Sequence, residues 1–145
     1  MTGGLNLREA DKVEITVLVD NYVDTFMEGN EYIKRPPICP PAAPLAEHGL
    51  ACLVKVYAGS EEHTLLMDAG HSAACLLHNL DYLKVDISKI EAIVLSHGHI
   101  DHFAGLIDFI KLAGKHISLV LHPDAFLERR LNVRTQNRQQ PMPRL

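Results

Sequence analysis

The segment Ile93–His102, with the sequence IVLSHGHIDH, decides how the rest of the chain is interpreted. Its first three residues are apolar and end a run typical of a buried strand, and the next seven contain three histidines and one aspartate. Imidazole and carboxylate groups suit a borderline divalent ion such as zinc. Four such groups on one tight connection would repel or stay unsatisfied on their own. The segment therefore predicts a metal site rather than a set of solvated surface histidines.

The spacing within this segment suits two metal ions better than one. His97 and His99 are two residues apart, so an extended or turning backbone directs both side chains to the same side, and Gly98 lets the chain bend closely around an ion. Asp101 and His102 are adjacent and point in different directions. We therefore expect His97 and His99 to hold a first ion and Asp101 and His102 a second, with a water or hydroxide between the two ions.

The composition describes a globular chain with room for one domain. The 145 residues are 47% hydrophobic, which excludes a disordered chain and allows a real core. A formal net charge of −4 gives no global attraction to nucleic acid or to an anionic membrane, so we expect neither as a partner. Nine histidines are many for this length and favour metal chemistry.

The cysteines and the N-terminal residues indicate the cellular compartment. Cys39, Cys52 and Cys75 are widely spaced and form no CxxC pair, which is typical of reduced thiols, and Cys52 and Cys75 are predicted to be buried. Residues 1–12 are polar and lack the apolar part of a signal peptide, and no apolar run approaches the length of a membrane span. The sequence therefore predicts a soluble cytoplasmic protein.

Apolar periodicity predicts a mixed sheet with helices outside it. Alternating or continuous apolar runs predict strands, and apolar stripes at helical spacing predict helices. Ser72 is expected to cap the first helix and Gly114 to end the second. The predicted strands are 13–19, 50–57, 63–67, 90–95 and 117–121, and the predicted helices run from 72 to 83 and from 103 to 113. A turn at Gly59–Glu62 would make the second and third strands a hairpin, and the alternation that follows is typical of an α/β domain.

Several stretches outside these elements are predicted to be irregular. Residues 22–45 lose periodicity and hold five prolines, which predicts a rigid loop of the kind that often covers a site. Residues 131–145 are predicted to be a polar, partly mobile tail with solvated arginines. Asp20–Asn21 is interpreted as a turn after the first strand. His48 is interpreted as a solvated loop residue in preference to a site residue, and His71 as a candidate substrate contact.

Two motifs carry a resemblance to a known family. His97–His102 resembles the HxHxDH signature of the metallo-β-lactamase-fold superfamily, and Leu65–Gly70 resembles the strand that ends in Asp-Ala-Gly in the same superfamily. The two motifs occur in the order that the superfamily has. Residues 17–21, 46–50 and 122–126 are similar to the branch of dihydropterin-linked ribofuranosylaminobenzene phosphate synthases.

The resemblance implies the αββα sandwich and a metal-dependent hydrolase or related transferase. Its substrate would be a small molecule with an ester, amide or phosphate group. His97, His99, Asp101 and His102 are implied as ligands of one or two Zn²⁺ ions, with Mn²⁺ or Fe as alternatives, and Asp101 is also implied as a catalytic residue. Asp68 is implied to support the metal loop by orienting a ligand imidazole, without binding the metal itself.

The chain departs from the family in length. Superfamily enzymes are longer, and their later half supplies metal ligands that no residue of this chain matches. We therefore expect residues 1–145 to form the N-terminal half of the sandwich, as a single truncated domain with an uncovered apolar sheet face. A homodimer or a complementing second chain would cover that face. The alternative to an enzyme is an incomplete, non-catalytic domain that acts as an interaction module or as one subunit of a split enzyme.

Overall fold

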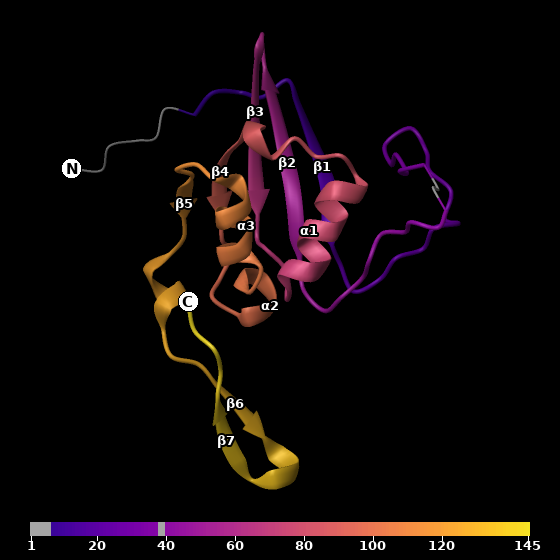
Figure 1. Ribbon diagram of the computed structural model, residues 1–145. Coiled ribbons are helices and arrows are strands. Elements are labelled where there is room, and N and C mark those ends of the chain that lie inside the picture. Colours follow the sequence, from indigo (N-terminus) through magenta and orange to yellow (C-terminus); the bar gives the residue numbers. More distant parts are fainter. Residues whose placement is uncertain (1–6, 38–39) are drawn as a thin grey trace, which may run out of the picture.

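Five strands form one mixed sheet with helices on one side of it (Figure 1), which confirms the predicted α/β class. The computed structural model describes residues 7–37 and 40–145. The strands of the sheet are β1 (Lys12–Val19), β2 (Ala51–Ala58), β3 (Glu61–Met67), β4 (Ile90–Val94) and β5 (Ser118–Val120). The α-helices are α1 (Ala73–Tyr82), α2 (Ile100–Phe103) and α3 (Leu106–Ala113). Short 3₁₀ helices lie at Ile87–Lys89, Pro123–Phe126 and Arg134–Gln136, and β6 (Arg130–Val133) pairs with β7 (Arg138–Pro141) in a separate hairpin.

The topology brings several strand ends to one edge of the sheet. The strands lie in chain order from β1 to β5. β1, β2 and β3 pair antiparallel, whereas β3, β4 and β5 pair parallel because helices carry the chain back between them. The carboxyl ends of β1, β3, β4 and β5 therefore meet at one edge, beside the residues that lead into β2. The histidine-rich segment lies at this edge because it follows β4 directly.

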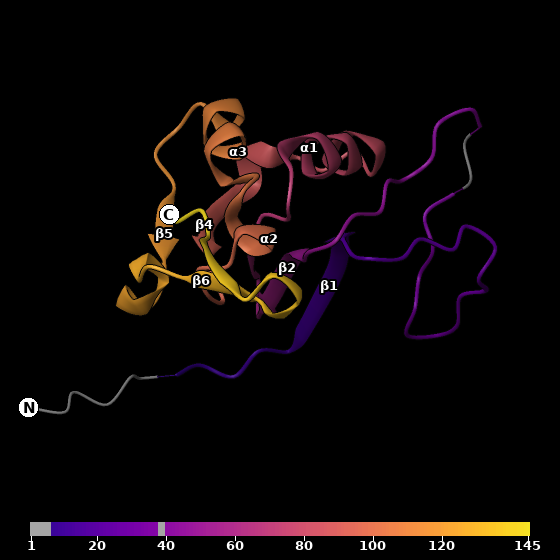
Figure 2. The ribbon, with the colours of Figure 1, turned by 90° about the horizontal axis from the view of Figure 1, so that it is seen from below.

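The core lies between the sheet and the helices. Leu53, Leu66 and Ile93 come from the central strands, and each is at most 3% exposed. Figure 2 shows α1 and α3 on the same side of the sheet, where their apolar stripes cover these residues. The helices contribute Leu76, Leu80, Leu106 and Phe109 to the core.

Local sequence signals set the ends of the two longer helices, as predicted. The Ser72 hydroxyl accepts a hydrogen bond of 3.2 Å from the backbone N–H three residues later, and Gly114 ends α3 with a φ of 60°. The single helix predicted from Phe103 is instead divided into α2 and α3. Gly105 lies between them, and a Cβ atom there would overlap the carbonyl oxygen of Ala69, so this turn packs closely against the residues after β3.

Two other predictions of local structure are wrong. Glu61 and Glu62 belong to β3, because Gly59 takes a φ of 61° and makes a tight turn with Ser60. Residues 131–145 are not irregular, since Val133 and Arg138 close the β6–β7 hairpin. The side chains of this hairpin are mostly exposed, so its solvated character agrees with the prediction.

The proline-rich loop lies beside α1 (Figure 1). The Tyr82 hydroxyl donates a hydrogen bond of 3.0 Å to the carbonyl oxygen of Pro37. The buried Asn79 side chain donates to the carbonyl oxygen of Leu45 and accepts from its N–H, both at 2.8 Å. The described residues in the second half of this loop are therefore held in place by α1 rather than by the histidine-rich segment.

Figure 2 shows that the described residues leave the sheet face opposite the helices largely uncovered, and exposed apolar side chains lie on this face. Val13, Ile15 and Val17 of β1 lie on this face and are 51%, 65% and 53% exposed. Their partners on β2 share the face because directly paired residues point to the same side. These partners are Val56, Val54 and Cys52. An exposed apolar face of this kind is typical of a surface that another domain or chain covers.

Cys52 and Cys75 are buried free thiols, as predicted. Burial raises the pKa of both thiols, that of Cys75 to about 11, so both stay protonated and unreactive at neutral pH. Cys39 lies outside the described residues. In the part of the chain that the structure describes, no helix has the length and apolar character needed to cross a membrane.

Candidate metal centre

The histidine-rich segment leaves the end of β4 as a turn and then enters α2. Leu95 is buried, and its N–H donates a hydrogen bond of 2.9 Å to the carbonyl oxygen of Val120, the last residue of β5. His99 stands directly before α2, whose four residues include Asp101 and His102. The strand and the short helix therefore place the four predicted ligands together at the carboxyl edge of the sheet.

Three histidine rings and a carboxylate lie close together in this segment. His97 Nε2 is 3.0 Å from His99 Nδ1, and the ring centroids of His97 and His102 are 4.1 Å apart. Asp101 Oδ2 lies 3.6 Å from His102 Nε2. The four residues thus form two pairs, His97 with His99 and Asp101 with His102. The two pairs are in contact through the His97 and His102 rings.

Asp68, which follows β3, lies fully buried beneath the segment. Its carboxylate accepts hydrogen bonds from the N–H of Ser96 at 2.8 Å, from the hydroxyl of Ser96 at 2.7 Å and from His102 Nδ1 at 2.8 Å. Because an ionised carboxylate accepts and does not donate, His102 carries its proton on Nδ1 and keeps the lone pair of Nε2 free. Asp68 has a φ of 59°, a conformation that Asp and Asn tolerate better than most residues.

The surroundings of His97 favour its neutral form. Burial lowers the pKa of His97, and the neighbouring His102 and His99 rings lower it further, whereas Asp68 and Asp101 act in the opposite direction. A neutral imidazole has a free lone pair and is the form that binds a metal ion. A neutral His97 keeps one ring nitrogen with a free lone pair.

The donor atoms fit divalent ions as pairs. Two nitrogen ligands held by one tetrahedral zinc at about 2.0–2.1 Å lie about 3.3 Å from each other. The 3.0 Å separation of His97 Nε2 and His99 Nδ1 is close to that value. Within residues 7–37 and 40–145, no group of three or more His, Cys, Asp or Glu side chains is arranged to hold a metal ion. The segment supplies ligands of suitable chemistry two at a time.

His48 reaches the segment from a distant part of the sequence. Its Nε2 lies 3.3 Å from Asp101 Oδ2, and its Nδ1 lies 3.1 Å from the Asn21 side-chain oxygen. The sequence interpretation of His48 as a solvated loop residue is right about exposure but misses the contact with Asp101. The His71 ring lies 6.5 Å from the His48 ring, at the edge of the same group. The sequence signal for this contact is Gly49, directly after His48, since glycine permits the backbone to approach another segment closely.

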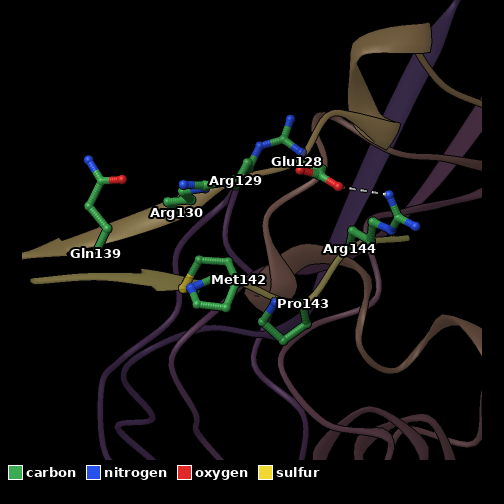
Figure 3. Close-up of a pocket in the computed structure, with 8 residues that line it drawn as sticks. Glu128, Arg129, Arg130, Gln139, Met142, Pro143 and Arg144 are labelled. Carbon is green, nitrogen blue, oxygen red and sulfur yellow. Dashed lines mark hydrogen bonds and ion pairs between the residues drawn. The ribbon is translucent and has the colours of Figure 1, made fainter.

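Residues 128–130, 139 and 141–144 line a pocket of about 560 Å³ that contains three arginines (Figure 3). Arg129 Nη1 lies 2.7 Å from the position that a Cβ atom of Gly98 would occupy, so this side chain packs on the histidine-rich segment. Arg130 and Arg144 line the same pocket, and Arg144 forms an ion pair of 3.3 Å with Glu128. These arginines, which the sequence suggests are solvated, line one pocket, and Arg129 connects it to Gly98 of the histidine-rich segment.

Comparison with protein families identifies the class of this chain. Residues 49–143 match the model described as the metallo-beta-lactamase superfamily, and this range is more than half of the chain. The chain therefore belongs to the metallo-β-lactamase superfamily, as its two motifs predict. The five-stranded mixed sheet is the part of that fold which the described residues build.

Two relatives from Methanocaldococcus jannaschii are similar to about half of the chain. The first, named 7,8-dihydropterin-6-methyl-4-(beta-D-ribofuranosyl)-aminobenzene-5'-phosphate synthase, is 33% identical over 81 residues, which are 56% of this chain and 28% of that protein. The second, an uncharacterized protein, is 33% identical over 84 residues, which are 58% of this chain and 31% of that protein. The chain thus spans less than a third of the length of either relative.

Solved structures with a similar backbone include a subclass B3 metallo-beta-lactamase isolated from a soil metagenome library. The two chains are 16% identical and superpose with a TM-score of 0.42. The match covers 68% of this chain and 38% of the other.

Proposed function

We propose that this chain provides the metal-binding half of a metal-dependent hydrolase, or of a related transferase, with the metallo-β-lactamase fold. The observation that supports this proposal most is the grouping of His97, His99, Asp101 and His102 at one edge of the sheet, above the buried carboxylate of Asp68. Membership of the superfamily supports the same function.

The ligands are proposed to work in two pairs. His97 and His99 would hold one ion, and Asp101 and His102 a second, with Zn²⁺ as the expected metal and Mn²⁺ or Fe as alternatives. When bound, such an ion supplies Lewis-acid chemistry, because it polarises a carbonyl or phosphoryl oxygen and lowers the pKa of water at the site. Asp68 would act without touching the ion, by holding the His102 ring in the tautomer whose Nε2 is free.

Asp101 is the proposed catalytic residue. Its side chain is 20% exposed, so the carboxylate is shielded but still accessible from solvent. The Oδ2 atom lies 3.3 Å from His48 and 3.6 Å from His102. A carboxylate held in this way accepts a hydrogen bond or a proton from water or from a substrate hydroxyl.

The proposed substrate is a small molecule with an anionic group. Three arginines line one pocket, in which the Arg129 guanidinium donates to backbone carbonyl oxygens and Arg144 pairs with Glu128. Guanidinium groups bind phosphate and carboxylate oxygens well, and an anionic substrate would compete for these contacts. The name of the first relative includes a 5'-phosphate, which agrees with a phosphate-bearing substrate. The net charge of −4 argues against nucleic acid as a partner, and the reduced cysteines favour a cytoplasmic protein.

The metal content of purified protein tests this function. The double variant His97→Ala/His99→Ala should lose bound zinc, measured by inductively coupled plasma mass spectrometry after purification with zinc present. The matched control is His63→Ala/His116→Ala, which removes the same number of histidines from exposed positions outside the segment and should keep the metal. Equal metal content in the two double variants would remove the proposal.

A second candidate function is a subunit or interaction module. The observation that favours it is the exposed apolar face of Val13, Ile15 and Val17. A second copy of the chain or a complementing second chain would cover this face. Light scattering coupled to size-exclusion chromatography distinguishes the cases. A metal-free monomer favours a non-catalytic domain, whereas a zinc-loaded complex of two chains favours a split enzyme.

A further inference from the structure

The four residues before β2 are fixed against the candidate metal centre. The N–H of Leu50 donates a hydrogen bond of 3.3 Å to the carbonyl oxygen of Asp101, and the carbonyl oxygen of Leu50 accepts one of 3.0 Å from Gly70. Gly49 is buried and has a φ of 136°, and a Cβ atom there would overlap the Asp101 carbonyl oxygen. The backbone on the C-terminal side of His48 therefore lies directly on the histidine-rich segment, and this position requires glycine.

The residue before His48 is equally well fixed. The N–H of Glu47 donates a hydrogen bond of 3.1 Å to the carbonyl oxygen of Asp20. Its carboxylate accepts from the N–H of His71 at 3.0 Å, and from the N–H and the hydroxyl of Ser72 at 2.7 Å and 2.6 Å. These contacts tie Glu47 to the end of β1 and to the start of α1. The backbone of His48 is thus held from both sides, although its side chain is 77% exposed.

The His48 ring bridges two parts of the site. Nδ1 lies 3.1 Å from the side-chain oxygen of Asn21, which follows β1, and Nε2 lies 3.3 Å from Asp101 Oδ2. Both nitrogen atoms thus lie beside side-chain oxygens, and a neutral ring, which has one N–H, donates to one of these oxygens at a time. An exposed side chain of this kind contributes little to folding stability, so its fixed backbone and its two oxygen neighbours call for another explanation.

We propose that His48 is a positioning residue that holds the carboxylate of Asp101 in place, with Asn21 as its anchor. This inference rests on the proposed function, and it adds a residue from outside the HxHxDH segment to the centre. Asp68 supports His102 from the buried side, and His48 supports Asp101 from the exposed side. Partners of this kind, which contact a metal ligand but not the metal, typically change metal affinity or activity by about 10–100-fold when they are removed.

The zinc affinity of the purified 145-residue chain tests the proposal. Zinc is first removed with a chelator, and the dissociation constant is then measured by competition with a chromophoric chelator for the wild type, His48→Ala, His48→Gln and Asn21→Ala. His48→Ala should weaken zinc binding by about tenfold or more. His48→Gln should restore most of the affinity, because the glutamine amide can donate from nearly the position of Nε2. Asn21→Ala should weaken binding less than His48→Ala does.

The melting temperature of each metal-free variant separates positioning from folding. It should match that of the metal-free wild type for all three variants, and His63→Ala serves as the matched control for loss of an exposed histidine. If the wild type binds zinc and His48→Ala binds it with the same affinity, the inference is overturned and the proposed function stays intact. Equal weakening in His48→Ala and His48→Gln also overturns it, since a direct ligand would behave in that way. A wild type that binds no zinc instead refutes the proposed function.

Discussion

Replacement of Asp68 by asparagine should weaken both the fold and the metal centre. The substitution keeps the shape of the side chain and suits the φ of 59°, because Asn tolerates this conformation as Asp does. It removes the charge that accepts three hydrogen bonds of 2.7–2.8 Å from Ser96 and His102. The amide has one acceptor oxygen, so its NH₂ group must face at least one of the former donors.

The structure gives the size of the effect. Hydrogen bonds to a charged group contribute about 1.5–3 kcal/mol each, and one donor left unsatisfied in a buried place costs a similar amount. We expect the metal-free Asp68→Asn variant to lose about 2–3 kcal/mol of unfolding free energy, which lowers the melting temperature by about 4–12 °C in a domain of this size. Zinc affinity should also fall by about 10–100-fold, because His102 loses the group that orients it.

Urea denaturation followed by circular dichroism measures the first quantity, and competition with a chromophoric chelator measures the second. The control is Asp81→Asn, whose side chain is 83% exposed and forms an ion pair of 3.1 Å with Lys84. Surface pairs of this kind contribute about 0–1 kcal/mol, so the control should stay close to the wild type. If Asp68→Asn resembles Asp81→Asn in both stability and zinc affinity, Asp68 does not support the site in the way described.

Three further perturbations test other parts of the structure. Gly98→Ala should lower the unfolding free energy by about 1–3 kcal/mol, because the new Cβ atom would overlap the Ala125 carbonyl oxygen. Urea denaturation compares this variant with Gly59→Asn, at a position where a Cβ atom meets no atom within 4 Å. Equal unfolding free energies would contradict the close packing of Gly98 against Ala125. Lys12, and then the Tyr57 hydroxyl at 2.7 Å, lower the pKa of Glu14 to about 2, so Tyr57→Phe should raise that pKa toward 4.5 in an NMR titration. Glu14 contributes to stability above pH 4.5, and this contribution is lost as the pH falls through about 2; it should be smaller in Tyr57→Phe. An unchanged pKa of Glu14 in Tyr57→Phe would exclude the hydrogen bond from the Tyr57 hydroxyl. Ile15 is 65% exposed on the uncovered face, so Ile15→Lys should reduce self-association and the binding of a hydrophobic dye, with little change in unfolding free energy. Unchanged self-association and dye binding would show that this face does not cause association.

The sequence alone predicted most of the secondary structure, because its signals are local. Apolar alternation in β1 and the Ser72 and Gly114 signals at the helix ends depend on residues close together in the chain. The prediction failed where tertiary contacts decide. The β6–β7 hairpin is polar and has no apolar face to reveal it, and the break at Gly105 depends on close packing against Ala69.

The same distinction explains what was predicted about the site. His97, His99, Asp101 and His102 could be named together because they lie within six consecutive residues. His48 and Asn21 could not be placed beside them, since their position depends on how β1 and β2 pair and on the close approach at Gly49. Periodicity carries no information about such an approach between distant segments, and a glycine after an exposed histidine has many simpler explanations.

The proposed function requires the segment from Ser96 to His102 to bind divalent metal ions. Crystals of the protein soaked with zinc and measured at the zinc absorption edge test it most directly. An anomalous peak is expected at about 2.0–2.1 Å from nitrogen atoms of both His97 and His99. A map without a peak near these rings, with zinc bound instead at exposed positions such as His63 and Glu91, would contradict it.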